Sequence, residues 1–263
     1  MNKVMTFLEK YFLPAADKIG KQRHLMAIRN GLIATLPLTI VGSIFVIFLN
    51  LPINGYEEMI ASFRPILDIP FRFTVGVMAL YASFSIGHFL GDSYKLDTLT
   101  SGLLSVLAFL ISSIVPIQVP ENVEGVIDSG RYLTIANLSS TSLFGAIITT
   151  IITIEIYRFF VEKNITIKMP DSVPPAVSKS FAALIPTFVI ILLFWGIKYG
   201  LNFDINNVVT IAVSPLKSLL VGNNLFGGVL TVLLIQLFWS FGIHGEAVLG
   251  PIIRPMWDSA ILE

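Results

Sequence analysis

Long uncharged runs separated by short polar segments dominate the chain. Six of these runs reach or approach the ~20 helical residues that cross a hydrocarbon core of about 30 Å. None alternates steadily between apolar and polar positions, and all are far longer than the ~10 residues of a membrane-barrel strand. The pattern therefore predicts an all-α, polytopic transmembrane protein with about six spans in this chain. The predicted spans are Gly31–Leu51, Phe73–Leu90, Leu99–Val119, Tyr132–Ile154, Ser180–Ile197 and Ser218–Ile243.

The residues before the first span mix apolar and charged positions. Within residues 1–18, Phe7, Leu8 and Phe12 lie among Lys3 and Lys10. This mixture predicts an amphipathic helix lying on the membrane surface, with a frayed leader as the alternative. There is no uninterrupted apolar core of the kind found in a secretory signal.

The pattern changes after residue 201. Residues 1–201 hold five cleanly separated spans, which predicts one helical domain. Residues 202–263 are irregular: a half-buried helix at Asn206–Leu220 is interrupted at Pro215, and the last span ends in closely spaced glycines and prolines. Irregular backbone at membrane depth survives only inside protein or beside a wet cavity, and broken apolar segments indicate a transport site. We therefore expect 202–263 to begin a transport domain with re-entrant segments, whose functional part lies near Trp239–Pro255.

Composition narrows the class of protein. Hydrophobic residues make up 54% of the chain and charged residues 13%, against roughly 25% charged in a soluble domain. Mean hydropathy is +0.81. A soluble fold of this size could not bury that much apolar surface, so the lipid bilayer is a predicted partner. The balance of 17 basic and 17 acidic residues argues against nucleic acid, and the absence of cysteine excludes disulfides and thiolate chemistry within this chain.

The distribution of Lys and Arg predicts orientation. Basic residues concentrate in cytoplasmic loops of membrane proteins. With the N-terminus inside, the inner segments carry twelve: Lys3, Lys10, Lys18, Lys21, Arg23, Arg29, Lys95, Arg158, Lys163, Lys168, Lys179 and Arg254. The outer segments carry five: Arg64, Arg72, Arg131, Lys198 and Lys217. We therefore expect a multi-pass membrane protein with six crossings and a cytoplasmic N-terminus.

One cluster combines the residue types of a sugar site. Trp239, His244, Gly245 and Glu246 follow one another at the end of the sixth run. An aromatic ring can stack on the apolar face of a pyranose, an imidazole can orient a hydroxyl or take its proton, and glycine lets backbone approach a ligand. The alternatives are an interfacial Trp, a His bonded to a backbone carbonyl and a solvated Glu at a helix end.

Other polar residues carry weaker signals. Asn137 is a candidate partner for a sugar hydroxyl, although Asn in a membrane helix more often bonds to a neighbouring helix. His88 is expected to be structural and His24 to belong to a basic inner rim. Glu155 and Arg158, spaced i,i+3, are expected to form an ion pair. The chain has no nucleotide-binding glycine loop and no zinc-protease motif, so no cofactor or metal is predicted, and energy must come from an ion gradient or a partner protein.

Four segments resemble one known family: Gln22–Gly31, Tyr94–Leu103, Ser172–Pro186 and Trp239–Gly245. Together they resemble the membrane-embedded IIC permease of the bacterial phosphoenolpyruvate-dependent sugar phosphotransferase system. The resemblance runs over essentially the whole chain and points to the lactose/cellobiose/diacetylchitobiose family, with the diacetylchitobiose-type transporter as the nearest match.

The resemblance implies a homodimeric carrier whose first five helices face the partner copy. It implies that a disaccharide is bound from outside and phosphorylated at its 6-hydroxyl, at the inner face, by a phosphorylated IIB protein. The chain would then be a transporter subunit of a phosphotransferase complex. The family histidine falls on His244, whose partner Glu comes from a later motif that we do not find before Glu263. We therefore expect the chain to be C-terminally incomplete.

Two alternative functions remain open at this stage. An ion-coupled secondary sugar transporter would need a carboxylate or a backbone sodium site at membrane depth, and no deep carboxylate is evident. An integral membrane enzyme acting on lipid would need a convergent acid–base or metal constellation, whereas the chain offers one histidine at the end of the last run.

Overall fold

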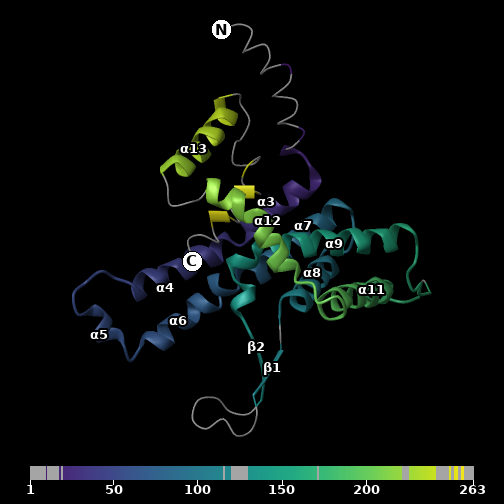
Figure 1. Cartoon of the computed structure of the whole chain (residues 1–263). Coiled ribbons are helices and arrows are strands. Elements are labelled where there is room, and N and C mark those ends of the chain that lie inside the picture. Colours follow the sequence, from purple (N-terminus) through teal and green to yellow (C-terminus); the bar gives the residue numbers. More distant parts are fainter. Residues whose placement is uncertain are drawn as a thin grey trace.

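The computed structural model describes residues 10, 18, 20–114, 116–119, 130–170, 172–220, 225–240, 249, 252–253 and 256–257. These residues form helices and one short antiparallel hairpin (Figure 1), which confirms the predicted helical class. The longer helices are α3 Arg23–Ala34, α4 Leu36–Leu49, α6 Arg64–Arg72, α7 Met78–Ser93, α8 Thr98–Ser113, α9 Leu143–Glu162, α11 Leu184–Trp195, α12 Ile205–Leu220 and α13 Leu225–Ser240. The shorter elements are α5 Tyr56–Ile60, η2 Val75–Val77, β1 Pro116–Val119, β2 Gly130–Leu133, η3 Ala136–Leu138, η4 Ser140–Ser142, α10 Pro175–Ala182 and η5 Gly196–Gly200.

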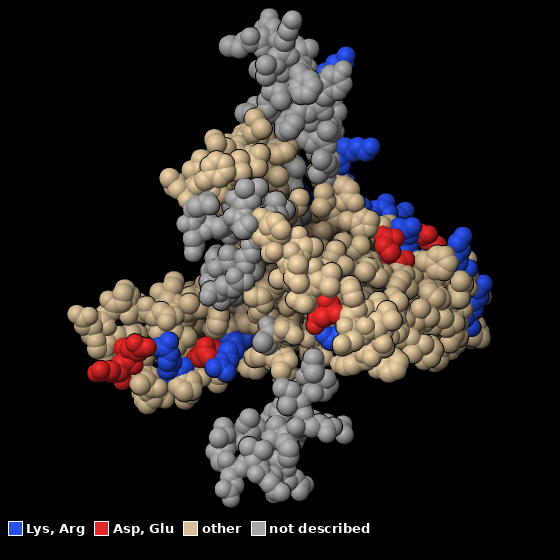
Figure 2. All heavy atoms as spheres, in the orientation of Figure 1, with Lys and Arg blue, Asp and Glu red and all other residues tan. Residues whose placement is uncertain are grey.

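The helices α3, α7, α8, α9 and α11 pack as a bundle. The α4–α5–α6 arm projects from one end of this bundle, and the β1–β2 hairpin leaves it to one side (Figure 1). Charged side chains form a row along the arm (Figure 2). Away from the arm, basic side chains lie where α3 begins, at Lys21 and Arg23, and where α9 ends, at Arg158 and Lys163; we call this the basic end of the bundle.

One predicted span, Gly31–Leu51, contains a bend, and a second bend lies at the start of the predicted span Phe73–Leu90. The helices α3 and α4 meet at 43°, and α6 meets the stretch 75–93 at 45°. Pro37 lies in the first turn of α4, and its missing N–H prevents the α3 ladder from continuing. Thr74, with φ −111° and ψ −85°, leaves the helical conformation between α6 and η2. The break at Pro37 lies inside an apolar run and is not visible in the hydropathy pattern, whereas the break at Thr74 follows α6, which carries Arg64, Asp68 and Arg72.

The described helices differ in whether each is long enough to cross a membrane by itself. Ser140–Glu162 and Val177–Gly200 are each long and apolar enough to cross a membrane, and the two bent pairs raise the number to four if each is one span. The helices α8 and α13, with 16 residues each, are apolar but shorter than that criterion requires.

Three predicted span boundaries are wrong. Residues 116–119 and 130–133 are strands rather than helix ends, with Pro116 opposite Leu133. The helix α8 ends at Ser113, and Ile114 is already extended with ψ 134°. Pro116 could not have continued the helix, and a four-residue apolar run does not distinguish a strand from a helix end. The predicted span Ser218–Ile243 is divided between α12, which ends at Leu220, and α13, which begins at Leu225.

Small residues bring the bundle helices together. A Cβ added at Gly31 of α3 would stand 2.4 Å from the Ile86 side chain of α7. A Cβ at Gly87 of α7 would stand 2.2 Å from Ser105 Oγ of α8. Such close approach is the usual basis of helix association in membranes, where lipid removes the hydrophobic driving force between helices. The bundle is therefore a tight scaffold, and the irregular second part of the chain is built upon it.

Candidate functional site

The predicted sugar-site cluster lies mainly in residues that the structure does not describe. His244, Gly245 and Glu246 fall outside the described residues, so their roles remain predictions. Trp239 is the penultimate residue of α13. The predicted histidine, His244, therefore follows the end of α13 closely in the sequence, five residues after Trp239.

Two described residues that follow this cluster in the sequence, Ile253 and Met256, are buried against other helices. Ile253 and Met256 are 5% and 1% exposed. They pack with Phe144 of α9, Val213 of α12 and Leu230 of α13. In the sequence, the predicted site therefore lies between the end of α13 and these buried apolar residues.

Asn137 has a local structural partner. It lies on η3, immediately after the hairpin, and its side chain is exposed. Its Nδ2 donates to the carbonyl oxygen of Ser113, 3.0 Å away, at the end of α8. The amide therefore satisfies one of the last carbonyls of that helix, which otherwise lacks a partner within the helix. The amide oxygen of Asn137 is the half that remains for a ligand.

A cluster of polar side chains joins three helices at the basic end of the bundle. We call His24, Tyr94, Glu155 and Arg158 the His24 cluster. The Glu155 carboxylate accepts from His24 Nε2 at 2.9 Å and from the Tyr94 hydroxyl. Its other oxygen lies 3.0 Å from the Arg158 guanidinium. The expected ion pair between Glu155 and Arg158 is confirmed. His24, expected in a basic rim, is hydrogen-bonded to the same carboxylate.

The same cluster fixes the state of its imidazole. Gln22 Nε2 donates to His24 Nδ1 at 2.8 Å, so Nδ1 carries no proton. The proton is then on Nε2, which donates to Glu155. With three donors on one carboxylate, Glu155 has little capacity left to act as a base. The cluster therefore clamps α3 and the end of α7 to α9.

Tyr94 stands at the centre of this clamp. The guanidinium carbons of Arg23 and Arg158 lie 4.4 and 4.5 Å from the centroid of its ring, a geometry that is attractive because of the ring quadrupole. Burial, and then the nearby Glu155 carboxylate, raise the pKa of Tyr94 above its usual value. The phenol therefore remains a proton donor at physiological pH.

A second ion pair ties α10 to the start of α8. The Asp97 carboxylate accepts from the backbone N–H of Thr100 at 2.9 Å, which caps α8, and lies 3.2 Å from Lys179 Nζ. The Thr100 hydrogen bonds, and then Lys179, hold the pKa of Asp97 below its usual value despite partial burial. Both contacts are structural.

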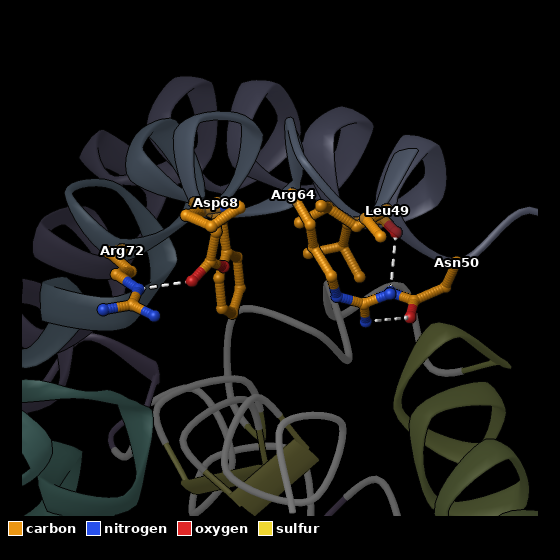
Figure 3. A pocket seen from close by; sticks show the side chains of 9 residues that line it. Leu49, Asn50, Arg64, Asp68 and Arg72 are labelled. Carbon is orange, nitrogen blue, oxygen red and sulfur yellow. Dashed lines mark hydrogen bonds and ion pairs between the residues drawn. The ribbon is translucent and has the colours of Figure 1, made fainter. Parts of the chain in front are cut away.

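A groove of about 550 Å³ lies in the arm between α4 and α6 (Figure 3). Arg64, Asp68 and Arg72 follow each other at four-residue spacing and line it from α6. Asp68 pairs with Arg72, and Arg64 NH2 lies 3.5 Å from Asn50 Oδ1. The lining thus carries two positive charges and one negative charge, and Arg64 also pairs with Glu57 at 3.4 Å.

A buried amide links the bundle to α12. Asn206 is 8% exposed, and its Nδ2 donates to Ser113 Oγ at 2.7 Å. Its Oδ1 occupies the space of a side chain at Gly145, because a Cβ there would stand 1.4 Å from that oxygen. The glycine thus permits α12 to dock against α9 through a polar contact.

Sequence reasoning did not predict several of these contacts. The Asn206–Ser113 bond joins residues 93 positions apart, and the His24–Glu155 bond joins residues 131 positions apart. One signal was present: Gln22 and His24 belong to the first segment that resembles the permease family, and Tyr94 and Asp97 belong to the second. Among the described residues, no group of three or more His, Cys, Asp or Glu is placed to hold a metal ion.

Comparison with known proteins places these observations in a family. The profile of the family described as "Phosphotransferase system, EIIC" matches residues 29–263. A cellobiose-specific EIIC component of Geobacillus stearothermophilus is 40% identical over 100% of this chain and 60% of its own length. A lichenan permease IIC component of Bacillus subtilis is 38% identical over 99% of this chain and 60% of its own length.

A solved structure agrees with these relatives. The crystal structure of the IIC component from the N,N'-diacetylchitobiose-specific phosphotransferase system superposes with a TM-score of 0.81 at 42% identity. The match covers 95% of this chain and 60% of that one. The chain thus spans about 60% of the length of these relatives.

Proposed function

The chain belongs to the EIIC family of the phosphotransferase system, and from this membership we propose that it serves as the sugar-carrying membrane component of a disaccharide transport system. The observation that carries the proposal is the family match over residues 29–263, which includes the Trp239–Gly245 segment. Relatives named for cellobiose and diacetylchitobiose support a disaccharide of that class as substrate. A phosphorylated IIB protein at the cytoplasmic face is the proposed donor.

His244 is the proposed chemical residue. Phosphoryl transfer through a loose transition state requires positioning more than a strong base, because bonding to the attacking oxygen is weak until late. The bond from the IIB donor to phosphorus breaks while the bond from the sugar 6-oxygen to phosphorus forms. His244 orients this hydroxyl and takes its proton as the new bond forms.

Four further residues are assigned to the proposed site. Trp239 supplies a stacking surface for a sugar ring, and Gly245 allows backbone to approach the substrate. Glu246 and Asn137 are assigned to sugar hydroxyls.

The proposed site is tested by separating binding from chemistry. His244→Gln should retain much of the sugar binding while phosphorylation by phospho-IIB falls by about two orders of magnitude or more. Trp239→Ala is the control, since loss of a stacking surface should weaken binding first. Both quantities are measured on the same purified variant. A His244→Gln protein that phosphorylates sugar at near wild-type rate would remove His244 from the mechanism, and parallel loss of binding, folding and phosphorylation would make it structural.

The proposed orientation places the N-terminus in the cytoplasm, supported by the basic asymmetry of the loops. The chain has no cysteine, so a single Cys at Asn2 can be labelled without background. It should resist an impermeant reagent added to intact cells, and rapid labelling would reverse the topology.

The proposed assembly is a homodimer in contact through residues 1–201. Cysteine pairs in the five-span part should crosslink two copies. Crosslinks confined to residues 202–263 would place the interface in the second part of the chain instead.

A further inference from the structure

A cavity of about 310 Å³ opens between the start of α3 and the end of α7. Lys21 and Arg23, both exposed, stand at its mouth, and Met26, Ala27 and Phe89 form its wall. The cavity therefore has a cationic mouth and an apolar wall. It lies at the end of the bundle where basic residues gather, which is the level expected for lipid headgroups.

The Arg23 guanidinium is held in place before any ligand arrives. It stacks on the Tyr94 ring at 4.4 Å, and the Tyr94 hydroxyl is bound to Glu155. The side chain therefore loses less conformational freedom on binding an anion than a free arginine would. Its N–H groups are suited to phosphate oxygens.

The cavity becomes less polar along α3. Asn30 lies seven residues beyond Arg23, about 10 Å along the helix axis. Its Oδ1 accepts both 3.1 Å bonds from Arg29, so its Nδ2 is the group available to the cavity. Met26 and Ile33 share this face of the helix and are 37% and 47% exposed. A charged group, an amide donor and exposed apolar side chains thus follow one another, in the order of phosphate, ester and acyl chain in a phospholipid.

We propose that this cavity binds phosphatidylglycerol, with the phosphate at Lys21 and Arg23, an ester carbonyl at the Asn30 amide, and an acyl chain along Met26 and Ile33. Asp92 also lines the cavity and is exposed. A carboxylate opposes a bare phosphate, but it accepts hydrogen bonds from the two hydroxyls of a glycerol headgroup. The choice of a polyol headgroup follows from this residue.

The test is a lipid titration of the purified protein in neutral detergent, followed by native mass spectrometry. Phosphatidylglycerol should bind in preference to phosphatidylcholine of the same chain length. The double variant Lys21→Gln/Arg23→Gln should weaken phosphatidylglycerol binding roughly 25-fold, at about fivefold for each basic residue near a membrane surface. The matched control, Lys163→Gln/Lys168→Gln, removes two exposed charges that do not line the cavity and should leave binding unchanged.

Further variants keep the proposal falsifiable if the charge variant folds poorly. Met26→Trp fills the cavity without changing charge and should also weaken binding, whereas Lys21→Arg, which keeps the charge and leaves Arg23 stacked on Tyr94, should retain it. Asp92→Asn should reduce the preference for phosphatidylglycerol over phosphatidic acid. Equal binding of phosphatidylcholine, wild-type affinity in Met26→Trp, or full displacement of the lipid by millimolar inorganic phosphate would each overturn the proposal, the last by making this a soluble-anion site.

Discussion

The contact between Gly145 and Asn206 offers a quantitative test of how α12 docks on the bundle. A Cβ at Gly145 would stand 1.4 Å from Asn206 Oδ1 and 2.6 Å from its Cγ, but 3.3 Å from its Cα. The obstruction is therefore the amide side chain and not the backbone. The substitution Gly145→Ala should displace this amide and break its 2.7 Å bond to Ser113.

The expected loss of stability on Gly145→Ala is the sum of three contributions. A buried hydroxyl left without its partner costs about 1–3 kcal/mol, and overpacking adds about 1–3 kcal/mol. Replacing a helical glycine by alanine returns about 1 kcal/mol. Gly145→Ala should thus lower the free energy of unfolding by about 3 kcal/mol. Gly228→Ala in α13 is the matched control, because nothing lies within 4 Å of its added Cβ, and it should be neutral or stabilising by up to about 1 kcal/mol.

A double-mutant cycle reverses the sign of the effect. Asn206→Ala removes the amide, so Gly145→Ala in that background should be neutral or stabilising. Unfolding is followed by titration with sodium dodecyl sulfate in mixed micelles. The reasoning fails if Gly145→Ala is as harmless as Gly228→Ala in the wild-type background, or if its cost is undiminished when Asn206 is absent.

Three further predictions concern the ends of the helices and the His24 cluster. Asp97→Ala should destabilise the protein by about 0.5–2 kcal/mol through loss of the α8 cap, while Asp97→Asn keeps the cap. Because the pKa of Asp97 is lowered in the folded state, the stability it adds is complete above its unfolded value near 4 and is lost as pH falls through the lower folded value; a wild-type advantage over Asp97→Asn that grew in acid would contradict this. Tyr94→Phe keeps the ring between two guanidinium groups but removes the hydroxyl bound to Glu155, so unfolding should be easier by about 1–3 kcal/mol, and Tyr94→Leu should cost more; equal effects of the two would show that the ring contributes nothing. Lys95 has a left-handed φ of 59°, so Lys95→Gly should stabilise by up to about 1 kcal/mol, whereas Lys163→Gly, at φ −83°, should not; thermal unfolding of the two variants side by side decides.

The hydrophobic pattern predicted the class of fold because membrane crossing imposes length and composition on every span. It did not predict the bend at Pro37, since the apolar run continues through it, nor that the charged helix α6 precedes the second span with a bend at Thr74. It extended two spans into residues 116–119 and 130–133, which pair with each other as strands. Pairing of that kind depends on residues brought together from a distance, and hydropathy does not report it.

Among the polar contacts, the sequence predicted the one within a helix and missed those between helices. The Glu155–Arg158 pair was predicted because both residues lie on one helix at i,i+3. The partners that His24 and Asn206 find on other helices require the packing of the bundle, which no local pattern encodes. The candidate sugar site was reached by another route, from residue types and the family resemblance at Trp239–Gly245, and it stays a prediction.

The measurement that tests the account most directly is the chemical form of sugar taken up by membrane vesicles containing the protein. Labelled cellobiose or diacetylchitobiose is supplied outside, with or without phosphorylated IIB inside. The account predicts that label accumulates as sugar phosphate and only when phosphorylated IIB is present. Accumulation of free disaccharide, driven by an ion gradient in the absence of IIB, would contradict it and favour a secondary transporter.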